Sequence, residues 1–249
     1  MKKYVIIYFW EADSMKLLAS DYDRTLYTNE KNLMLNMKAI KKFRLYCNKF
    51  VLVTGRSFKS IKKEIEYYNI KYDYLACNNG LIVFDDKDNI IDSSLLVQAD
   101  LNYIYELLNG NKDVKRFEFY GVNDCVYELN NILEVYVKFK NIKILKQYKK
   151  YIETGRAGIR CFTIGNKMFI SNNRTKADAV EFIRNLDDID IDDVYTVGDS
   201  VNDLEMLERY NGHKMLFSHP KLLLKDIPVT KEVHQLIKKI NNKNRFKEY

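Results

Sequence analysis

The feature that most constrains the fold is a series of short apolar runs, each of which ends in small or polar residues. Residues 17–20, 50–53 and 74–77 are such runs, and Asp21 and Thr54 directly follow the first two. Strands buried on both faces of a sheet are continuous apolar runs, and open α/β sheets bind ligands at the carboxyl ends of their strands. The sequence therefore predicts a doubly wound, mostly parallel α/β sheet with its ligand loops on one edge.

The middle of the chain has a different pattern, with closely spaced strand-like runs, and we expect a separate α+β domain inserted into the first domain. We place the inserted domain at residues 85–170 and the first domain, a Rossmann-like unit, at residues 1–84 and 171–249. Helical spacing of apolar residues predicts the helices. The expected helices are 32–46, 58–68, 97–109, 142–153, 176–186, 203–210 and 231–240, and the further strands are 81–84, 90–91, 114–120, 124–129, 132–139, 159–164, 167–170, 194–197 and 213–217.

Two carboxylates, Asp21 and Asp23, stand one residue apart at the end of the first apolar run. Two such charges 4 Å apart repel by roughly 4 kcal/mol at an effective dielectric constant of 20, so the pair favours a bound cation. Asp-x-Asp also occurs at residues 86–88, 188–190 and 190–192, where no such run precedes it. The position after a buried strand distinguishes the first pair and predicts a metal site there.

With Thr25, this segment resembles the first motif, Asp-x-Asp-x-Thr, of the haloacid dehalogenase (HAD) superfamily of phosphohydrolases. The three later motifs of that family match in the same order, at Thr54, at Lys176 and at residues 198–203. Four matches in order are far more specific than any one of them. The long insert and the Asn79-Gly80 pair resemble the Cof-type branch, which has a large α/β cap.

The resemblance implies that Asp21 is the nucleophile that forms an aspartyl-phosphate, and that Asp23 is the general acid and base. It also implies a Mg²⁺ ion held by the Asp21 carboxylate, the Asp23 backbone carbonyl and Asp199. Asp203 would orient metal-bound waters or Lys176. The alternative for Asp203 is a carboxylate that only stabilises the start of a helix.

The phosphoryl oxygens would be bound by a hydroxyl on a loop and by an ammonium near a helix amino terminus. For two of the predicted binding residues a role without substrate is also possible. Arg56 also suits a surface ion pair, and Asn79-Gly80 also suits a tight turn. Lys176 could equally be one more solvated lysine. The predicted phosphate- and substrate-binding residues are Thr54, Gly55, Arg56, Asn79, Lys176 and Asn202.

Charge and cysteine content narrow the class of partner. The formal net charge is +7, but Lys and Arg are scattered among Asp and Glu, which favours an anionic small molecule over nucleic acid. The four cysteines lie far apart without a Cys-x-x-Cys pair, so we expect no structural zinc and reduced thiols in the cytoplasm.

The amino terminus starts like a signal peptide, with two lysines before the apolar stretch 4–10. Glu11 and Asp13 stand where a cleavage site of small residues would be needed, so we expect neither export nor a membrane span. Residues 1–14 precede the usual start of the resembling family. They are either an added strand or a segment upstream of a true start at Met15.

The sequence thus predicts a cytoplasmic magnesium-dependent phosphatase of a small phosphorylated metabolite, with a sugar phosphate as the favoured class. A phosphomutase with the same aspartyl-phosphate is the first alternative, and a non-catalytic protein that binds nucleic acid through its basic surface is the second. We expect the cap to supply selectivity, with strand 115–120 either lining the pocket or packing in the cap core. The sequence predicts neither the individual substrate nor the oligomeric state.

Overall fold

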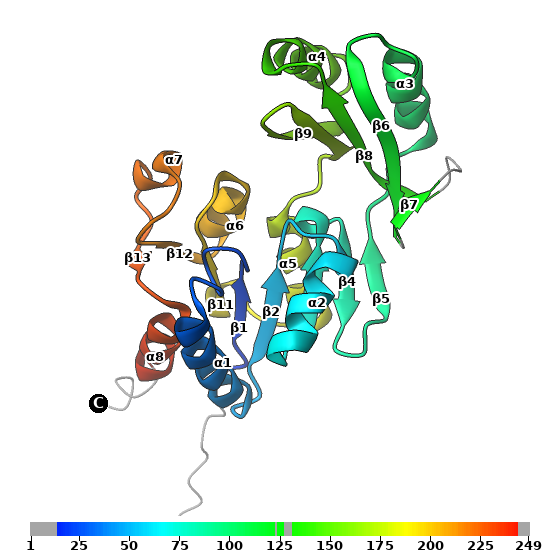
Figure 1. Ribbon diagram of the computed structural model, residues 1–249. Helices are drawn as coiled ribbons and strands as arrows, with labels where there is room; N and C mark the ends of the chain where they lie inside the picture. The colour runs from blue at the N-terminus through cyan, green and yellow to red at the C-terminus, as the bar shows by residue number, and fades with distance from the viewer. Residues whose placement is uncertain (1–13, 123, 127–130, 244–249) are drawn as a thin grey trace, which may run out of the picture.

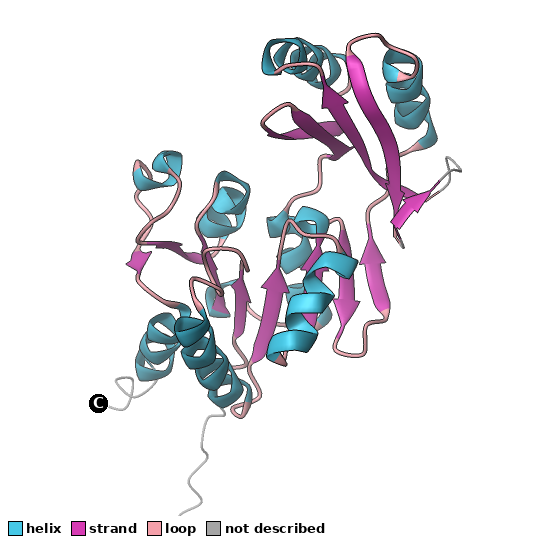
Figure 2. Ribbon diagram, viewed as in Figure 1, coloured by secondary structure: helices cyan, strands magenta, loops and turns pink. Residues whose placement is uncertain are grey.

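The structure is a computed structural model that describes residues 14–122, 124–126 and 131–243. It consists of an α/β part built on an eight-stranded sheet and a second part built on a five-stranded antiparallel sheet (Figure 1 and Figure 2). Residues 1–13, and with them most of the segment with the suggested added strand, lie outside the described residues. Among the described residues, no helix is both long and apolar enough to cross a bilayer.

The eight-stranded sheet has the strand order β13-β12-β11-β1-β2-β3-β4-β5. The strands from β13 to β3 are parallel, whereas β4 and β5 are antiparallel additions at one edge. This arrangement confirms the predicted doubly wound, mostly parallel fold. The strands are β1 Leu17–Ser20, β2 Lys49–Val53, β3 Tyr74–Cys77, β4 Ile82–Asp85, β5 Ile90–Ser93, β11 Val194–Gly198, β12 Asn211–Met215 and β13 Val229–Thr230.

Helices cover both faces of this sheet because alternate residues of its buried strands point to opposite sides. Leu18 of β1 packs in a cluster with side chains of α1, α2 and α8, whereas Leu17 and Ala19 pack with those of α5 and α6. The layers are therefore helix, sheet and helix. The helices are α1 Glu30–Arg44, α2 Phe58–Tyr68, α5 Lys176–Leu186, α6 Leu204–Arg209, α7 Pro220–Leu223 and α8 Val233–Lys243.

The second sheet has the order β7-β6-β8-β10-β9, and all its pairings are antiparallel. One face packs against two helices through an apolar cluster that includes Val135, Val137 and Phe139 of β8. The opposite face looks toward the α/β part (Figure 1). The elements are α3 Gln98–Leu108, β6 Val114–Gly121, β7 Asp124–Val126, β8 Ile132–Phe139, α4 Ile142–Gly155, β9 Ile159–Ile164 and β10 Lys167–Asn172.

The chain passes between the two parts twice, and the two passages are bonded to each other. Arg174 forms an ion pair with Asp92, and Asn172 Nδ2 donates to Ser94 Oγ at 2.6 Å. The predicted boundary at residue 85 falls before β5, yet β5 pairs with β4 in the eight-stranded sheet. We therefore propose that the core continues to about residue 94 and resumes after about residue 172.

Most predicted elements lie within two residues of the observed ones, and β12 is shifted by two residues at both ends. A strand was expected at 213–217, but β12 runs from Asn211 to Met215. Its first two residues are polar or small, and Gly212 lies so close to helix α6 that an added Cβ would be 2.0 Å from the Leu207 carbonyl oxygen. The expected strand 124–129 begins at Asp124, and its last three residues lie outside the described residues.

Candidate active site

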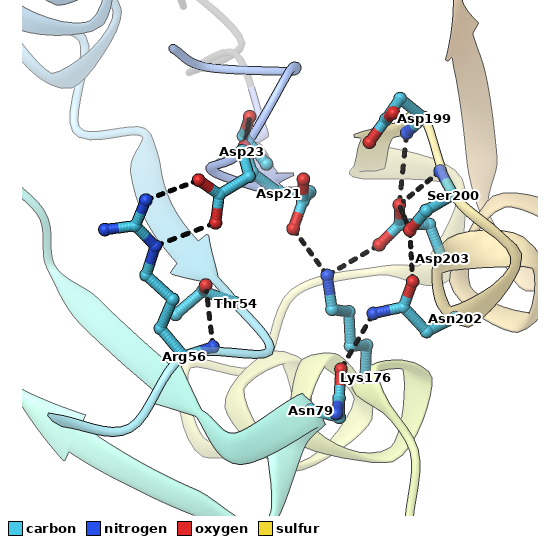
Figure 3. A network of polar contacts seen from close by, with 11 residues as sticks. Asp21, Asp23, Thr54, Arg56, Asn79, Lys176, Asp199, Ser200, Asn202 and Asp203 are labelled. Carbon is cyan, nitrogen blue, oxygen red and sulfur yellow. Dashed lines mark hydrogen bonds and ion pairs between the residues drawn. The ribbon is translucent and has the colours of Figure 1, made fainter. Parts of the chain in front are cut away.

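The carboxyl ends of four neighbouring strands bring the predicted residues to one edge of the sheet (Figure 3). Asp21 follows β1, Thr54 follows β2, and Asp199 follows β11. The Asp21 N–H donates to the Val197 carbonyl at 3.0 Å, and the Thr54 N–H donates to the Ala76 carbonyl at 2.8 Å. The sheet ladder thus continues to these residues and fixes their backbone positions.

Three carboxylates form a buried cluster at this edge. Asp21, Asp199 and Asp203 each offer an oxygen, and these oxygens all lie within 4.8 Å of one another. Burial is the main cause that raises the pKa of Asp21, and it likewise raises the pKa of Asp199 to about 6. Asp199 Oδ2 is buried and accepts no hydrogen bond from the described residues. Such a set of carboxylate oxygens fits a hard divalent cation.

Lys176 lies beside this cluster as the first residue of α5. Its fully buried ammonium donates to Asp21 Oδ1 and to Asp203 Oδ1, both at 2.6 Å (Figure 3). Burial alone would lower the lysine pKa, but the carboxylates of Asp203 and Asp21 outweigh it and raise that pKa. The alternative of a solvated lysine is therefore wrong, and the ammonium orients Asp21.

Asp203 supports the loop that carries Asp199. Its Oδ2 accepts from the Asp199 N–H at 3.1 Å, from the Ser200 N–H at 2.9 Å and from the Ser200 hydroxyl at 2.9 Å. Gly198 is needed here because an added Cβ would lie 2.5 Å from the Asp203 side chain. Asp203 thus stabilises the start of a helical turn, which was the alternative role expected for it, and it also contacts Lys176.

Asp23 points away from the acidic cluster and toward Arg56. Arg56 Nη2 and Nε donate to the two Asp23 carboxylate oxygens at 2.6 and 2.8 Å. Arg56 also pairs with Glu64 at 3.2 Å and lies over the Tyr22 ring at 5.1 Å. The ion-pair alternative for Arg56 is present in the structure, and it orients the Asp23 carboxylate. The predicted metal contact through the Asp23 carbonyl stays a prediction.

Asn79 and Asn202 meet across the site, since Asn202 Nδ2 donates to Asn79 Oδ1 at 2.8 Å. Asn79 has a left-handed backbone with φ of +58°, and Gly80 has φ of +92°. An added Cβ at Gly80 would lie 2.4 Å from the Thr175 carbonyl oxygen, at the start of α5. The tight turn expected at Asn79-Gly80 therefore exists, and it also presents Asn79 to the site.

The polar edge opens into a cavity of about 550 Å³ between the two parts of the molecule. Of the predicted residues, Thr54, Lys176 and Asp203 lie behind its wall. Thr54 is fully buried, and its Oγ1 accepts from the Arg56 N–H at 3.1 Å. The predicted residues that line the cavity are Asp21, Asp23, Gly55, Arg56, Asn79, Asp199 and Asn202.

The sequence analysis missed one cation, Arg24, which occupies the second variable position of the motif Asp-x-Asp-x-Thr. Arg24 has a left-handed φ of +62°, and its Nε lies 3.4 Å from Asp199 Oδ2. Its Nη2 donates to the Phe217 carbonyl at 2.8 Å. Arg24 also lines the cavity. A basic residue directly beside the two carboxylates of the motif was the available signal.

Strand 115–120 was one candidate for the part of the cap that lines the cavity. Only one of its residues does so. Tyr120 lines the cavity, whereas Phe117 and Phe119 pack on the opposite face against the cap helices. The remaining cap residues of the lining come from β8, β9 and β10 and were not predicted. They are Glu134, Phe162, Ile164 and Phe169.

Comparisons with known proteins identify the family of this chain. The family model of haloacid dehalogenase-like hydrolases matches residues 18–155 and 115–225. A protein of Mycoplasma capricolum subsp. capricolum is 26% identical, over 82% of this chain and 91% of that protein. The chain therefore belongs to the haloacid dehalogenase-like hydrolases, which confirms the resemblance seen in the sequence.

Solved structures show the same fold. A phosphatase of the HAD superfamily from Bacteroides thetaiotaomicron is similar with a TM-score of 0.75 and 15% identity, over 95% of this chain and 97% of that one. The sucrose-phosphatase of Synechocystis sp. PCC6803, in complex with sucrose and phosphate, has a TM-score of 0.68 and 15% identity, over 93% and 98%. These structures share the fold, and membership of the haloacid dehalogenase-like hydrolases makes the protein an enzyme of the hydrolase class.

Proposed function

We propose that this hydrolase is a magnesium-dependent phosphatase that cleaves the phosphate monoester of a small metabolite through an aspartyl-phosphate on Asp21. The observation that carries the proposal is the position of Asp21, which is held at 2.6 Å by Lys176 within a buried acidic cluster and lines a cavity of about 550 Å³. A nucleophile, a fixed cation and a divalent-metal site then meet at one place.

The residues fit Mg²⁺ on the chemistry of their donors. Asp21 and Asp199 provide carboxylate oxygens, and the buried Asp199 Oδ2 lacks a hydrogen-bond donor among the described residues. Both oxygens of Asp203 already accept hydrogen bonds, so we assign it the support of Lys176 and of the Asp199 loop. When bound, Mg²⁺ would neutralise charge between the Asp21 carboxylate and the phosphate dianion.

In the first step, an Asp21 carboxylate oxygen forms a bond to phosphorus while the bond from phosphorus to the ester oxygen breaks. For this step Asp23 must carry a proton, so that only one of its oxygens stays bonded to Arg56, and it gives that proton to the departing alkoxide while Arg56 holds its side chain at the cavity wall. In the second step, Asp23 takes a proton from water, the water oxygen bonds to phosphorus, and the Asp21 carboxylate leaves.

The remaining predicted residues would bind the phosphoryl group. Lys176 has one further N–H beside Asp21, and the Asn202 amide lines the same cavity as Asp21. The fully buried Thr54 fixes the loop that carries Gly55 and Arg56. Donors held in place before the reaction stabilise charge that develops in the transition state. Cover by the cap lowers the exposure of these donors to water and strengthens their effect.

We further propose a sugar phosphate as the substrate class and the cytoplasm as the location. The sucrose-phosphatase of Synechocystis has the same fold, and the cavity here has room for a sugar beside a phosphate. Cys47, Cys77 and Cys161 are free thiols, which suits a reducing compartment.

The test is release of inorganic phosphate from a panel of sugar phosphates with Mg²⁺ and with EDTA. We expect release with Mg²⁺ only, and loss of roughly 99% of it or more in Asp21→Asn, which removes the charge but keeps the volume. Conversion to an isomeric phosphate without free phosphate would indicate a phosphomutase instead. Full activity of folded Asp21→Asn would refute the nucleophile.

A further inference from the structure

The face of the cap sheet that does not pack against the cap helices lines one side of the cavity. Val135 and Val137 of β8 point into the cap core, so Glu134 and Tyr136 point to the other face. Glu134 is paired directly with Tyr120 on one side and with Ser171 on the other. The face that looks at the catalytic edge therefore carries a carboxyl group at its centre.

Aromatic rings surround this carboxyl group. The ring centroids of Tyr120 and Tyr136 are 6.5 Å apart, those of Tyr136 and Phe169 are 5.3 Å apart, and those of Phe162 and Phe169 are 6.3 Å apart. Phe162 is 40% exposed although it is a large apolar side chain in the cavity wall. Exposed apolar groups in a concave site mark a surface that a ligand covers.

Glu134 has no hydrogen bond or ion pair with any residue that the structure describes. The nearest strand offers a cation, Arg116, but its Nε donates to Glu118 at 2.5 Å, and Tyr120 donates to the same glutamate at 2.8 Å. Burial raises the pKa of Glu134 to about 7. Within the described lining, Glu134 is the only charged residue from the cap.

A carboxylate among aromatic rings is the chemistry that recognises an organic ammonium group. The rings attract the cation through their negative faces, and the carboxylate supplies the counter-charge and a hydrogen-bond acceptor. Beside a neutral hydroxyl group, Glu134 would have to keep an uncompensated charge in a partly dry site or take up a proton, whereas an ammonium group keeps the carboxylate ionised and pairs with it. The arrangement therefore favours a cation over a hydroxyl group.

We propose that Glu134 and the surrounding rings bind a protonated amino group on the alcohol part of the substrate. The substrate class is then a phosphate ester of an amino alcohol, such as an amino sugar, with its phosphate at Asp21 and its ammonium at the cap. This inference deepens the proposed phosphatase function and rests on it for the position of the phosphate.

The experiment compares matched esters that differ only in an amino or a hydroxyl group. The pairs are glucosamine 6-phosphate with glucose 6-phosphate, and phosphoethanolamine with ethylene glycol monophosphate. Calorimetry measures their binding to Asp21→Asn with Mg²⁺, and then to the same protein with Glu134→Gln. Glu106→Gln on the exposed side of α3 is the control for a lost carboxylate.

We expect at least one amino ester to bind about tenfold to a hundredfold more tightly than its hydroxyl partner, and Glu134→Gln to remove most of that preference. Glu106→Gln should leave the preference unchanged. Equal affinities in both pairs, absence of binding by all four esters, or a preference that survives Glu134→Gln would overturn the inference. If the amino esters bind more tightly but the wild type hydrolyses none of the esters, the proposed phosphatase function is overturned and the ammonium site at Glu134 is supported.

Discussion

Replacement of Lys176 by methionine is the sharpest test of the charge balance at the site. The lysine side chain is fully buried and lies 2.6 Å from both Asp21 and Asp203. Methionine keeps much of the volume but leaves two buried carboxylates without their cation. Loss of one partner from a buried ion pair typically costs about 3–5 kcal/mol of the free energy of unfolding.

Lys214 offers a matched control, because it is also buried but donates to backbone carbonyls of Leu222, Leu223 and Lys225. Lys214→Met removes a buried cation without leaving a charge behind, so we expect a smaller loss of about 1–3 kcal/mol. No titrating group faces Lys214 in these contacts. Its loss should therefore be the same at all pH values near neutrality.

The pH dependence of Lys176→Met should be different. Without the lysine, the pKa of Asp21 in the folded state rises further above its value in the unfolded chain. The folded variant then takes up a proton as the pH falls, which stabilises it relative to wild type. The deficit is therefore largest at pH 7.5 and should shrink by on the order of 1 kcal/mol at pH 5.5.

Urea unfolding in EDTA at the two pH values measures both variants against wild type, with the slope checked for a change in the unfolded state. The corresponding fall in melting temperature at pH 7.5 is roughly 6–20 °C for Lys176→Met. A Lys176→Met deficit no larger than that of Lys214→Met, or one that is equal at both pH values, would refute the argument that paired carboxylates depend on this cation.

Four other perturbations test the site and its cap. Arg56→Ala should lower kcat about tenfold or more with a smaller change in KM, because Asp23 loses its bidentate partner; steady-state kinetics would contradict this if only KM changed. The metal-free protein should be more stable at pH 5 than at pH 7.5, by about 1 kcal/mol from Asp199 alone. The raised pKa of Asp199 makes the folded state bind more protons than the unfolded state between these pH values. A free energy of unfolding that rises with pH in EDTA would refute this. Mg²⁺ with beryllium fluoride, which mimics the aspartyl-phosphate, should raise the melting temperature of wild type but not of Asp21→Asn; an equal shift in both would place the anion elsewhere. Replacement of residues 95–172 by a short linker should keep slow hydrolysis of an aryl phosphate and abolish preference among substrates; an unchanged ranking would move recognition to the core.

The core was predictable because its strands are buried on both faces. Such strands are apolar throughout, and their ends are marked by the polar residues that follow, so the sequence pattern alone places Asp21, Thr54 and Asp199 at one edge. The second strand of the edge hairpin, Ile90–Ser93, is largely exposed and carries no such mark. A hairpin of residues 81–84 with 90–91 follows from the sequence pattern, but the pattern does not show that its second strand belongs to the core and not to the inserted domain.

The cap lining was harder to predict for a physical reason. In an antiparallel strand the alternation shows that residues have two faces, but the docking of the cap decides which face meets the catalytic edge. Phe119 and Tyr120 are neighbours of similar chemistry, yet one is in the cap core and the other lines the cavity. Glu134 lies in an apolar run, and its isolation from any cation is visible only in three dimensions.

The position of β1 between β2 and β11 has a consequence for synthesis of the chain. Asp21 is near the start, whereas Lys176, Asp199 and Asp203 arrive only in the last third, after the whole cap sheet. Contacts within the cap sheet are between neighbouring strands in a continuous segment, and such local pairings form early. We therefore expect a nascent chain on the ribosome to fold its cap while the central sheet still has a gap beside β1. The enzyme would acquire its cation site and its nucleophile geometry together, as one late event when β11 enters that gap.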